Sequence, residues 1–508
     1  MTKKIFTLFA AVIVAATMCA QSPVSGSCGT NSKWYFDPSR GLLSISGSGE
    51  MDDYISGATP WYQYNKDITK IAILGEVPYI GTHAFWDLIN VTNVTIPGSV
   101  KKIGDYAFAS CGGLQSVRIE NGVQHIGKGA FGLCLTLEAV ALPNTVTTID
   151  EMAFGLCGSL KNVSIPASVT TLDKQAFAFC TSLQWIVNAA AIPQTLLEGV
   201  FNGVDKANCK LTILSSAEQA YRNTDEWKDF NIDPVQATAI GLCGDNMLWT
   251  YDYYTDAMVI SGAGRMYDFI EEWDDFKDDI ETLEIQEGVS TIGKYAFRDC
   301  YSLTSVVLPA SLDSVDTYPF SSCNALTSIE VAEENRGYSS LNGVLFNKNK
   351  TYLIKYPAAK SDKKYNIPNT VTYIYGYAFC DCQHYLNSLT IPSSVVDIGD
   401  LAFGYCSSLY EIYNYAEPQP LTGDMRVFAN VDQPHCKLYV PQEYYEQYKA
   451  AEVWKDFEVQ VTDREEGADK LSITTGESQG EASKILRNGQ LLINRNGKTY
   501  NALGAEMR

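Results

Sequence analysis

The chain has 508 residues, of which 46% are hydrophobic and 19% are charged, a composition typical of a folded protein with enough material for several domains. Its formal net charge of -21 argues against nucleic acid and anionic lipid surfaces as partners, because both are bound through patches of lysine and arginine. We therefore expect neither a nucleic-acid-binding protein nor a protein held on a membrane by basic residues.

The first segment, residues 1–20, has the features of a secretory signal peptide. Two lysines precede an apolar stretch over residues 5–16, and a small residue, Ala20, ends the segment. The apolar stretch is too short to span a bilayer, which needs about 20 residues. Cys19 would suit a lipoprotein signal, but the bulky Met18 before it does not. We predict cleavage after residue 20 and an exported mature chain with no transmembrane segment.

A repeat of 23 residues organises residues 21–240, which we assign to a first array with its own caps. The shared pattern is L-x-x-V-x-I-P-x-S-V-x-x-I-G-x-x-A-F-x-x-C. Its cysteines and phenylalanines recur at the same step, at Cys111, Cys134, Cys157 and Cys180 and at Phe85, Phe108, Phe131, Phe154 and Phe177. Such a repeat predicts a stack of similar coils.

Each coil has one stretch typical of a strand and one that favours a helical turn. The segment L-x-x-V-x-I alternates apolar and polar residues, and the proline that follows ends the strand. A glycine or aspartate then provides an acceptable helix N-cap, so we predict that A-F-x-x-C forms a single helical turn. Tyr375 takes this cap position in one coil. Because a single coil cannot bury its apolar residues, we predict a β-rich, right-handed solenoid with like residues stacked in ladders.

The pattern restarts in residues 241–462, which we assign to a second array. Its ladder residues are Phe297, Cys300, Phe320 and Cys323, then, after a longer variant of the repeat, Phe379, Cys382, Phe403 and Cys406. Both arrays open with Cys-Gly, at Cys28 and Cys243, and both close with Trp-Lys-Asp-Phe, at Trp227 and Trp454. The sequence therefore predicts two capped arrays in tandem, followed by a linker and tail over residues 463–508.

The repeat motif, the Cys-Gly opening and the Trp-Lys-Asp-Phe closure together resemble the BspA-like leucine-rich-repeat family, over roughly residues 27–461. The resemblance implies a leucine-rich-repeat solenoid that is secreted or displayed on a bacterial cell surface. It also implies adhesion to host extracellular matrix proteins. Residues 484–504 are similar to short tails of other secreted bacterial proteins and are either a sorting signal or a small hairpin with a tight turn at Asn496-Gly497.

The cysteines fall into two groups with different expected roles. In the first recognisable coil Leu88 takes the cysteine position, so we expect the ladder cysteines to be packing residues and not disulfides. Those outside the ladder are better candidates for pairing in an exported protein, although their connectivity cannot be read: Cys28, Cys209, Cys243, Cys380 and Cys436.

No catalytic, metal or cofactor site is indicated. The chain has only four histidines, and none stands in a motif typical of a hydrolase or metalloprotease. Cys380 to His384 could suggest a metal cluster, but Cys382 is already a ladder residue. The acidic run over residues 271–279 lacks the spacing of a calcium loop and is better interpreted as a solvated cap. We expect a non-enzymatic protein without cofactors.

Tyrosines are concentrated in the second array. Of the 31 in the chain, 23 lie between residues 242 and 461 and seven in the first array. Tyrosine is enriched at recognition surfaces, so we choose as candidate partner-binding residues those of the last coils: Tyr373, Tyr375, Tyr377, Tyr410, Tyr413 and Tyr415. The register predicts that Tyr413 and Tyr415 project from an open strand face. The alternative is that these tyrosines pack on the edges of the solenoid.

We therefore expect a binding protein, an adhesin or interaction module for host extracellular proteins. The alternative is a glycan-binding or scaffold component of the bacterial surface.

Overall fold

The computed structural model describes residues 22–268, 273–421, 426–464 and 466, and the backbone of four strands near the C-terminus. The predicted signal peptide lies outside the described residues. Within the described part, no helix is long and apolar enough to cross a membrane. Most of the structure consists of short strands joined by turns, with α1 (Glu218–Asn223) and α2 (Tyr445–Ala450) as its two described α-helices.

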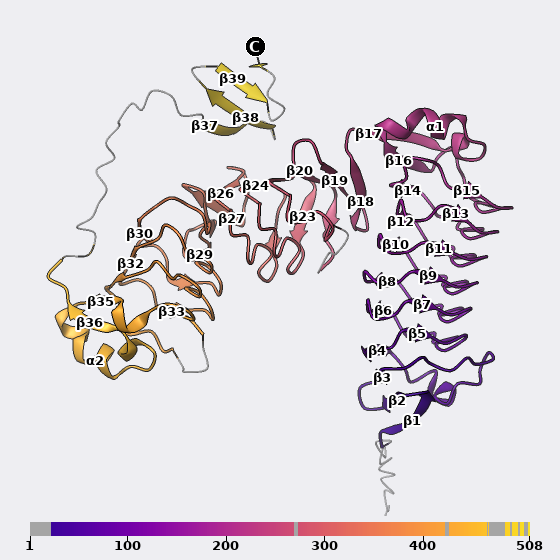
Figure 1. Ribbon diagram of the computed structural model, residues 1–508, viewed down its shortest axis with the longest axis horizontal. Helices are drawn as coiled ribbons and strands as arrows, with labels where there is room; N and C mark the ends of the chain where they lie inside the picture. Colours follow the sequence, from indigo (N-terminus) through magenta and orange to yellow (C-terminus); the bar gives the residue numbers. More distant parts are fainter. Residues whose placement is uncertain are drawn as a thin grey trace, which may run out of the picture.

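The first array begins with a four-stranded sheet and continues as a solenoid (Figure 1). The opening sheet contains β1 (Val24–Gly29), β2 (Ser32–Asp37), β3 (Leu42–Gly47) and β4 (Lys70–Gly75). The main sheet of seven strands contains β6 (Asn93–Ile96), β8 (Ser116–Ile119), β10 (Ala139–Ala141), β12 (Asn162–Ile165), β14 (Trp185–Asn188), β16 (Lys210–Leu214) and β17 (Asn231–Val235). A second sheet of two-residue strands contains β5 (Tyr79–Ile80), β7 (Lys102–Ile103), β9 (His125–Ile126), β11 (Thr148–Ile149), β13 (Thr171–Leu172) and β15 (Thr195–Leu196).

Neighbouring strands of both sheets are parallel and pair residues one coil apart. Val94 pairs with Val117 in the main sheet, and Ile80 pairs with Ile103 in the second sheet. The buried phenylalanines stack from coil to coil, with ring centroids 5.3 Å apart for Phe108 and Phe131. These ladders and the solenoid fold confirm the prediction from the repeat.

The predicted helical turn is wrong. The segment A-F-x-x-C forms consecutive turns and not a helix. Two residues of each coil have a left-handed backbone, as Tyr106 (φ 56°) and Ser110 (φ 61°) do in one coil. The backbone N–H groups donate to the next coil and not along a helix: the Phe108 N–H donates to the Ala130 carbonyl at 2.7 Å. Hydrogen bonding between coils therefore replaces the helical pattern.

The ladder cysteines are buried thiols with a defined partner. The Cys111 thiol donates to the Phe85 carbonyl at 3.1 Å, and the same bond joins Cys134 to Phe108 at 3.3 Å. The pairing expected outside the ladder is wrong for Cys28, Cys209, Cys380 and Cys436, which are free and buried; Cys243 is buried as well. Cys28, Cys209 and Cys436 lie within hydrophobic clusters, where burial without pairing costs little.

We expect the native chain to resist thiol alkylation. Burial raises the pKa of Cys111 from 9.0 to about 12, so its reactive thiolate is scarce at mildly alkaline pH. The pKa of Cys111 is higher in the folded chain than in the unfolded chain. The contribution of the neutral Cys111 thiol to the stability of the folded chain is therefore complete below pH 9.0 and is lost as the pH rises toward about 12. Mass spectrometry after iodoacetamide treatment should find Cys111 unmodified in the folded chain and modified in guanidinium chloride. Rapid modification of the folded chain would contradict this.

The second array repeats the opening and the closure of the first but is divided in the middle. Its first part has a sheet of β18 (Ala239–Gly244), β19 (Met247–Asp252), β20 (Ala257–Gly262), β22 (Thr282–Ile285), β24 (Ser305–Leu308) and β26 (Ser328–Val331), and a short-strand sheet of β21 (Gly264–Arg265), β23 (Val289–Ile292) and β25 (Ser314–Val315). Its second part has one sheet of β27 (Tyr338–Leu341), β28 (Val344–Asn347), β29 (Tyr352–Lys355), β31 (Tyr373–Ile374) and β33 (Asp397–Ile398), and another of β30 (Lys364–Asn366), β32 (Ser388–Ile391), β34 (Glu411–Asn414), β35 (Lys437–Val440) and β36 (Glu458–Val461). The hydrophobic core is divided at the same place.

Both closures are built alike. In the first, the Trp227 indole N–H donates to the Gln194 carbonyl at 3.0 Å and the Tyr221 hydroxyl to the Ala190 carbonyl at 3.1 Å. In the second, the Trp454 indole N–H makes the corresponding bond to the Gln419 carbonyl at 3.1 Å. Each buried tryptophan therefore covers the last coil of its array and satisfies a carbonyl there.

The start of the second array packs against the first. Strand β18 contacts β10, β12, β14 and β16 of the main sheet, and β18 lies beside this sheet in Figure 1. The Asn162 side chain of β12 donates to the Asp245 carbonyl and is only 4% exposed, and Ser164 of the same strand is also buried. Asn93 and Thr95 of β6, at the other end of this face, are exposed. The second array thus covers part of the outer face of the main sheet.

The C-terminal segment forms a small antiparallel sheet of β37 (Ser483–Arg487), β38 (Gln490–Arg495), β39 (Lys498–Asn501) and β40 (Glu506–Met507). Strands β38 and β39 pair on either side of Asn496-Gly497, as expected for the hairpin. The turn itself lies outside the described residues, and the sorting signal stays a prediction.

Candidate binding cleft

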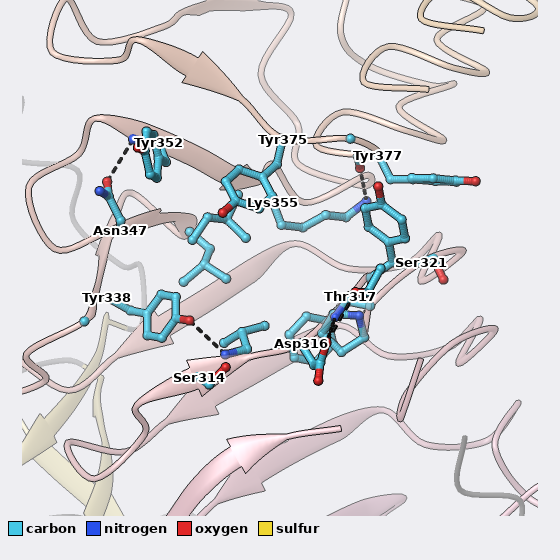
Figure 2. A pocket seen from close by; sticks show the side chains of 18 of the residues that line it. Ser314, Asp316, Thr317, Ser321, Tyr338, Asn347, Tyr352, Lys355, Tyr375 and Tyr377 are labelled. Atoms are coloured by element: carbon cyan, nitrogen blue, oxygen red, sulfur yellow. Dashed lines mark hydrogen bonds between the residues drawn. The ribbon is translucent and has the colours of Figure 1, made fainter. Parts of the chain in front are cut away.

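A cleft opens where the second array is divided. Strand β25 is the last of its sheet, and β31 pairs with β29 and β33 and not with β25. The cavity between them has a volume of about 550 Å³, within the range of small-molecule sites in proteins. Residues 313–321 form one wall, and β29 with residues 373–377 forms the other (Figure 2).

Six tyrosines line the cleft, more than any other residue type. They come from both walls and from the inserted strand β27: Tyr318, Tyr338, Tyr352, Tyr373, Tyr375 and Tyr377. The rings of Tyr318 and Tyr377 meet across the break, with centroids 4.4 Å apart. Tyr373 and Tyr375 stand edge to face at 5.1 Å, and Tyr352 lies 6.0 Å from Tyr375. The walls therefore present several aromatic surfaces at different angles.

The break follows from the longer variant of the repeat. After β26 the chain forms the β27–β28 hairpin in place of a regular turn, and its start is fixed by Asn335. The buried Asn335 side chain donates to the carbonyls of Pro309 and Leu312 at 2.7 and 3.0 Å, and its oxygen accepts from the N–H of Tyr338 at 2.7 Å. The hairpin thus holds Tyr338 at the end of the cleft.

Gly376 is required on the far wall. A side chain at this position would begin 2.6 Å from the Tyr318 hydroxyl, which is too close for a carbon atom. The glycine therefore allows Tyr318 to reach across the break. It also lies beside Tyr375 and Tyr377, two of the aromatic side chains that line the cavity.

The tyrosine hydroxyls are neutral and in part available. Burial raises the pKa of Tyr318, Tyr373 and Tyr377, so all three stay protonated at neutral pH and can donate or accept hydrogen bonds. Tyr338 is engaged, because its hydroxyl accepts from the Val315 N–H at 2.8 Å (Figure 2). At the rim, Asp316 forms an ion pair with Arg265 at 3.2 Å.

The model of the BspA type leucine rich repeat region matches six copies in this chain, over residues 61–184, 275–357 and 358–419. The chain belongs to the BspA-type leucine-rich-repeat family. This confirms the predicted resemblance. The cleft of this BspA-type chain includes residues on both sides of the junction between the second and third matched segments.

Solved structures of bacterial leucine-rich-repeat proteins are also similar to this BspA-type chain. A protein from Eubacterium ventriosum is 18% identical and covers 83% of this chain and 79% of its own, with a TM-score of 0.25. A leucine rich cell surface protein from Faecalibacterium prausnitzii is 21% identical, with coverages of 88% and 97% and a TM-score of 0.26. One from Bacteroides ovatus is 18% identical, with coverages of 85% and 98% and a TM-score of 0.23. No curated protein matches the chain.

The structure divides the six candidate tyrosines of this BspA-type chain into two groups. Tyr373, Tyr375 and Tyr377 come together in the cleft. Tyr410 lies outside it on the next coils and is 51% exposed, and Tyr415 lines a separate hollow. The predicted exposure of Tyr413 is wrong.

Tyr413 is only 6% exposed because two side chains cover its ring. The ring stacks on Tyr439 of the next strand at 4.7 Å, and the Arg464 guanidinium lies 4.7 Å from its centre. Arg464 follows β36, so the chain leaving the array folds back over the strand face. The repeat register gave no signal of this cover.

Sequence reasoning missed three residues that line the cleft. Tyr318 lies two coils before the selected cluster and Tyr338 one coil before it, and only the broken sheet brings them together with it. Lys355 was also missed, although a signal existed: a lysine stands between two apolar stretches of the longer repeat.

Proposed function

We propose that this chain is an exported, surface-displayed binding protein, an adhesin or interaction module that contacts a host extracellular protein through the tyrosine cleft of its second array. The observation that carries the proposal is the cleft itself, whose aromatic walls lie at the one interruption of both sheets among the described coils of the second array. Rigid tyrosines provide large amphipathic contact area at a low entropic cost.

The arrangement of the arrays favours the second array as the binding part. The face of the first array beside β12 is covered by the opening of the second, so Asn162 and Ser164 are buried there. In contrast, Tyr375 in the cleft is 40% exposed. A partner would therefore find the cleft accessible. The proposed role is binding and involves no catalysis.

We expect Tyr375→Ala to weaken binding to an extracellular partner about tenfold or more, as loss of an aromatic anchor does. The mature chain, residues 21–508, would be tested by surface plasmon resonance against a panel of immobilised matrix proteins. Tyr254→Ala is the matched control, because Tyr254 is 89% exposed and lies outside the cleft. Absence of binding to every panel member, or equal loss in both variants, would contradict the proposal.

A second candidate function is glycan binding, as part of the bacterial surface or as an adhesin. The specific observation in its favour is the combination of aromatic faces with polar side chains such as Asp313 and Asn347 around one cavity. A glycan array probed with the wild type and with Tyr373→Ala/Tyr375→Ala separates this function from protein recognition. Cleft-dependent signals on glycans, without binding to deglycosylated proteins, would favour it.

A further inference from the structure

Lys355 occupies a position where the other coils have small or apolar residues. The Tyr356 N–H donates to the Ala378 carbonyl at 2.8 Å and its ring stacks on Phe379 at 5.0 Å, so Tyr356 stands in the phenylalanine ladder. The residue before each ladder phenylalanine is buried and apolar: Ala84, Ala107, Ala130, Ala153, Ala176, Val200, Ala296, Pro319, Ala378, Ala402 and Val427. In this one coil a lysine takes the place of alanine.

The Lys355 ammonium is buried, and neighbouring groups compensate its charge and its hydrogen-bond donors only in part. The residue is 6% exposed, and its Nζ donates to the Tyr377 carbonyl at 3.2 Å (Figure 2) and to the Cys380 carbonyl at 3.4 Å. An ammonium group has three N–H donors, and in the described part of the chain no carboxylate forms an ion pair with Lys355. A buried positive charge without a negative partner is costly, so an anion brought to this position would be stabilised.

Lys355 lines the same cleft as the tyrosines. The cavity therefore combines one buried cation with aromatic faces and neutral hydroxyl groups. The carboxylates of Asp313 and Asp316 also line it. Asp316 is paired with Arg265, but the Asp313 carboxylate and the net charge of -21 oppose a ligand that carries many negative charges. The site fits a ligand with a single acidic group surrounded by uncharged polar groups.

We propose that the cleft binds a saccharide unit with one carboxylate, whose acid group pairs with the Lys355 ammonium while its ring packs against the tyrosines. The inference rests on the proposed function, because the acidic sugar would be carried by the extracellular partner. Sugar hydroxyls match the tyrosine hydroxyls and the rim carboxylates, which accept hydrogen bonds. A peptide carboxylate has the same charge but brings no comparable set of hydroxyl groups to Asp313 and Asp316.

The test uses isothermal titration calorimetry on the mature chain, residues 21–508. The probes are N-acetylneuraminic acid and glucuronic acid, the methyl ester of each, and an acetylated and amidated glutamate. We expect at least one acid to bind and its ester to bind about tenfold or more weakly, because the ester loses the charge-assisted contact. This comparison needs no variant.

The variants then locate the contact. Lys355→Met keeps the length of the apolar stem and should remove the preference for acid over ester. Tyr375→Ala should weaken acid and ester alike. Lys364→Met removes the same charge from an exposed position on β30 and should leave both affinities unchanged. If Lys355→Met does not fold, Lys355→Gln keeps a donor for the two carbonyls and should show the same loss of preference.

The inference is overturned if acid and ester bind equally, if neither acid binds, or if the glutamate probe binds more tightly than both sugars. Loss of preference in Lys364→Met but not in Lys355→Met would also overturn it. If no sugar binds but matrix proteins still bind through Tyr375, the inference fails and the proposed function stands. If an acidic sugar binds through Lys355 but no matrix protein binds, the inference stands and the proposed function fails.

Discussion

Replacing Phe131 by alanine should lower the free energy of unfolding by about 3–5 kcal/mol, as expected for a large buried ring. Phe131 is fully buried, and its ring stacks between Phe108 and Phe154 with centroid distances of 5.3 and 5.4 Å. The parallel strands fix the spacing of the coils, so neighbouring rings cannot close the cavity without disturbing their own pairing. Urea unfolding followed by tryptophan fluorescence would measure the change.

The control for this prediction is Leu135→Ala in the same coil. Leu135 is 54% exposed, so its truncation should change the free energy of unfolding by less than about 0.5 kcal/mol. If the two substitutions changed the free energy of unfolding equally, the buried ring ladder would not stabilise the fold as we expect.

Replacing Trp454 by alanine should be about as costly, at roughly 3–5 kcal/mol, and its effect should begin at the end of the second array. The ring is fully buried, packs against Phe428 and Tyr448 at 5.2 and 5.4 Å, and donates to the Gln419 carbonyl. Its removal leaves that buried carbonyl without its partner and uncovers the last coil.

Hydrogen exchange would localise this effect. In Trp454→Ala, amides of β34, β35 and β36 should lose protection, while those of β8 and β10 keep it. Trp86→Ala is the matched control, because Trp86 is partly exposed and its main described ring contact is Tyr62 at 5.8 Å. Unchanged protection in β36, or the same loss in both variants, would contradict the role of Trp454 as a cap.

The ladders could be predicted from the sequence because they depend on spacing alone. A phenylalanine every 23 residues, with a strand that ends at a proline in six of the repeats, leaves stacking as the only way to bury the rings. The turn after the ladder ring could not be predicted in the same way. Its left-handed residues include Tyr106 and Leu133 as well as Gly129, so residue type gives no consistent signal.

The sequence predicted some of the residues that line the candidate site but not the others. The composition bias pointed to Tyr373, Tyr375 and Tyr377, which do line the cleft. It also pointed to Tyr413, which Arg464 covers from outside the repeat. The repeat register places residues within a coil, but it carries no information on where a sheet stops or where a following segment folds back. Both events depend on contacts between segments that are distant in sequence.

The interruption between β25 and β31 has a consequence for the number of ligands. A surface that every coil repeats would offer several equivalent sites, and the amount bound would grow with the length of the array. A cleft formed by one interruption would hold one ligand per chain, however many regular coils lie on either side. Chains with a regular coil added to or removed from the first array should therefore keep the same binding stoichiometry.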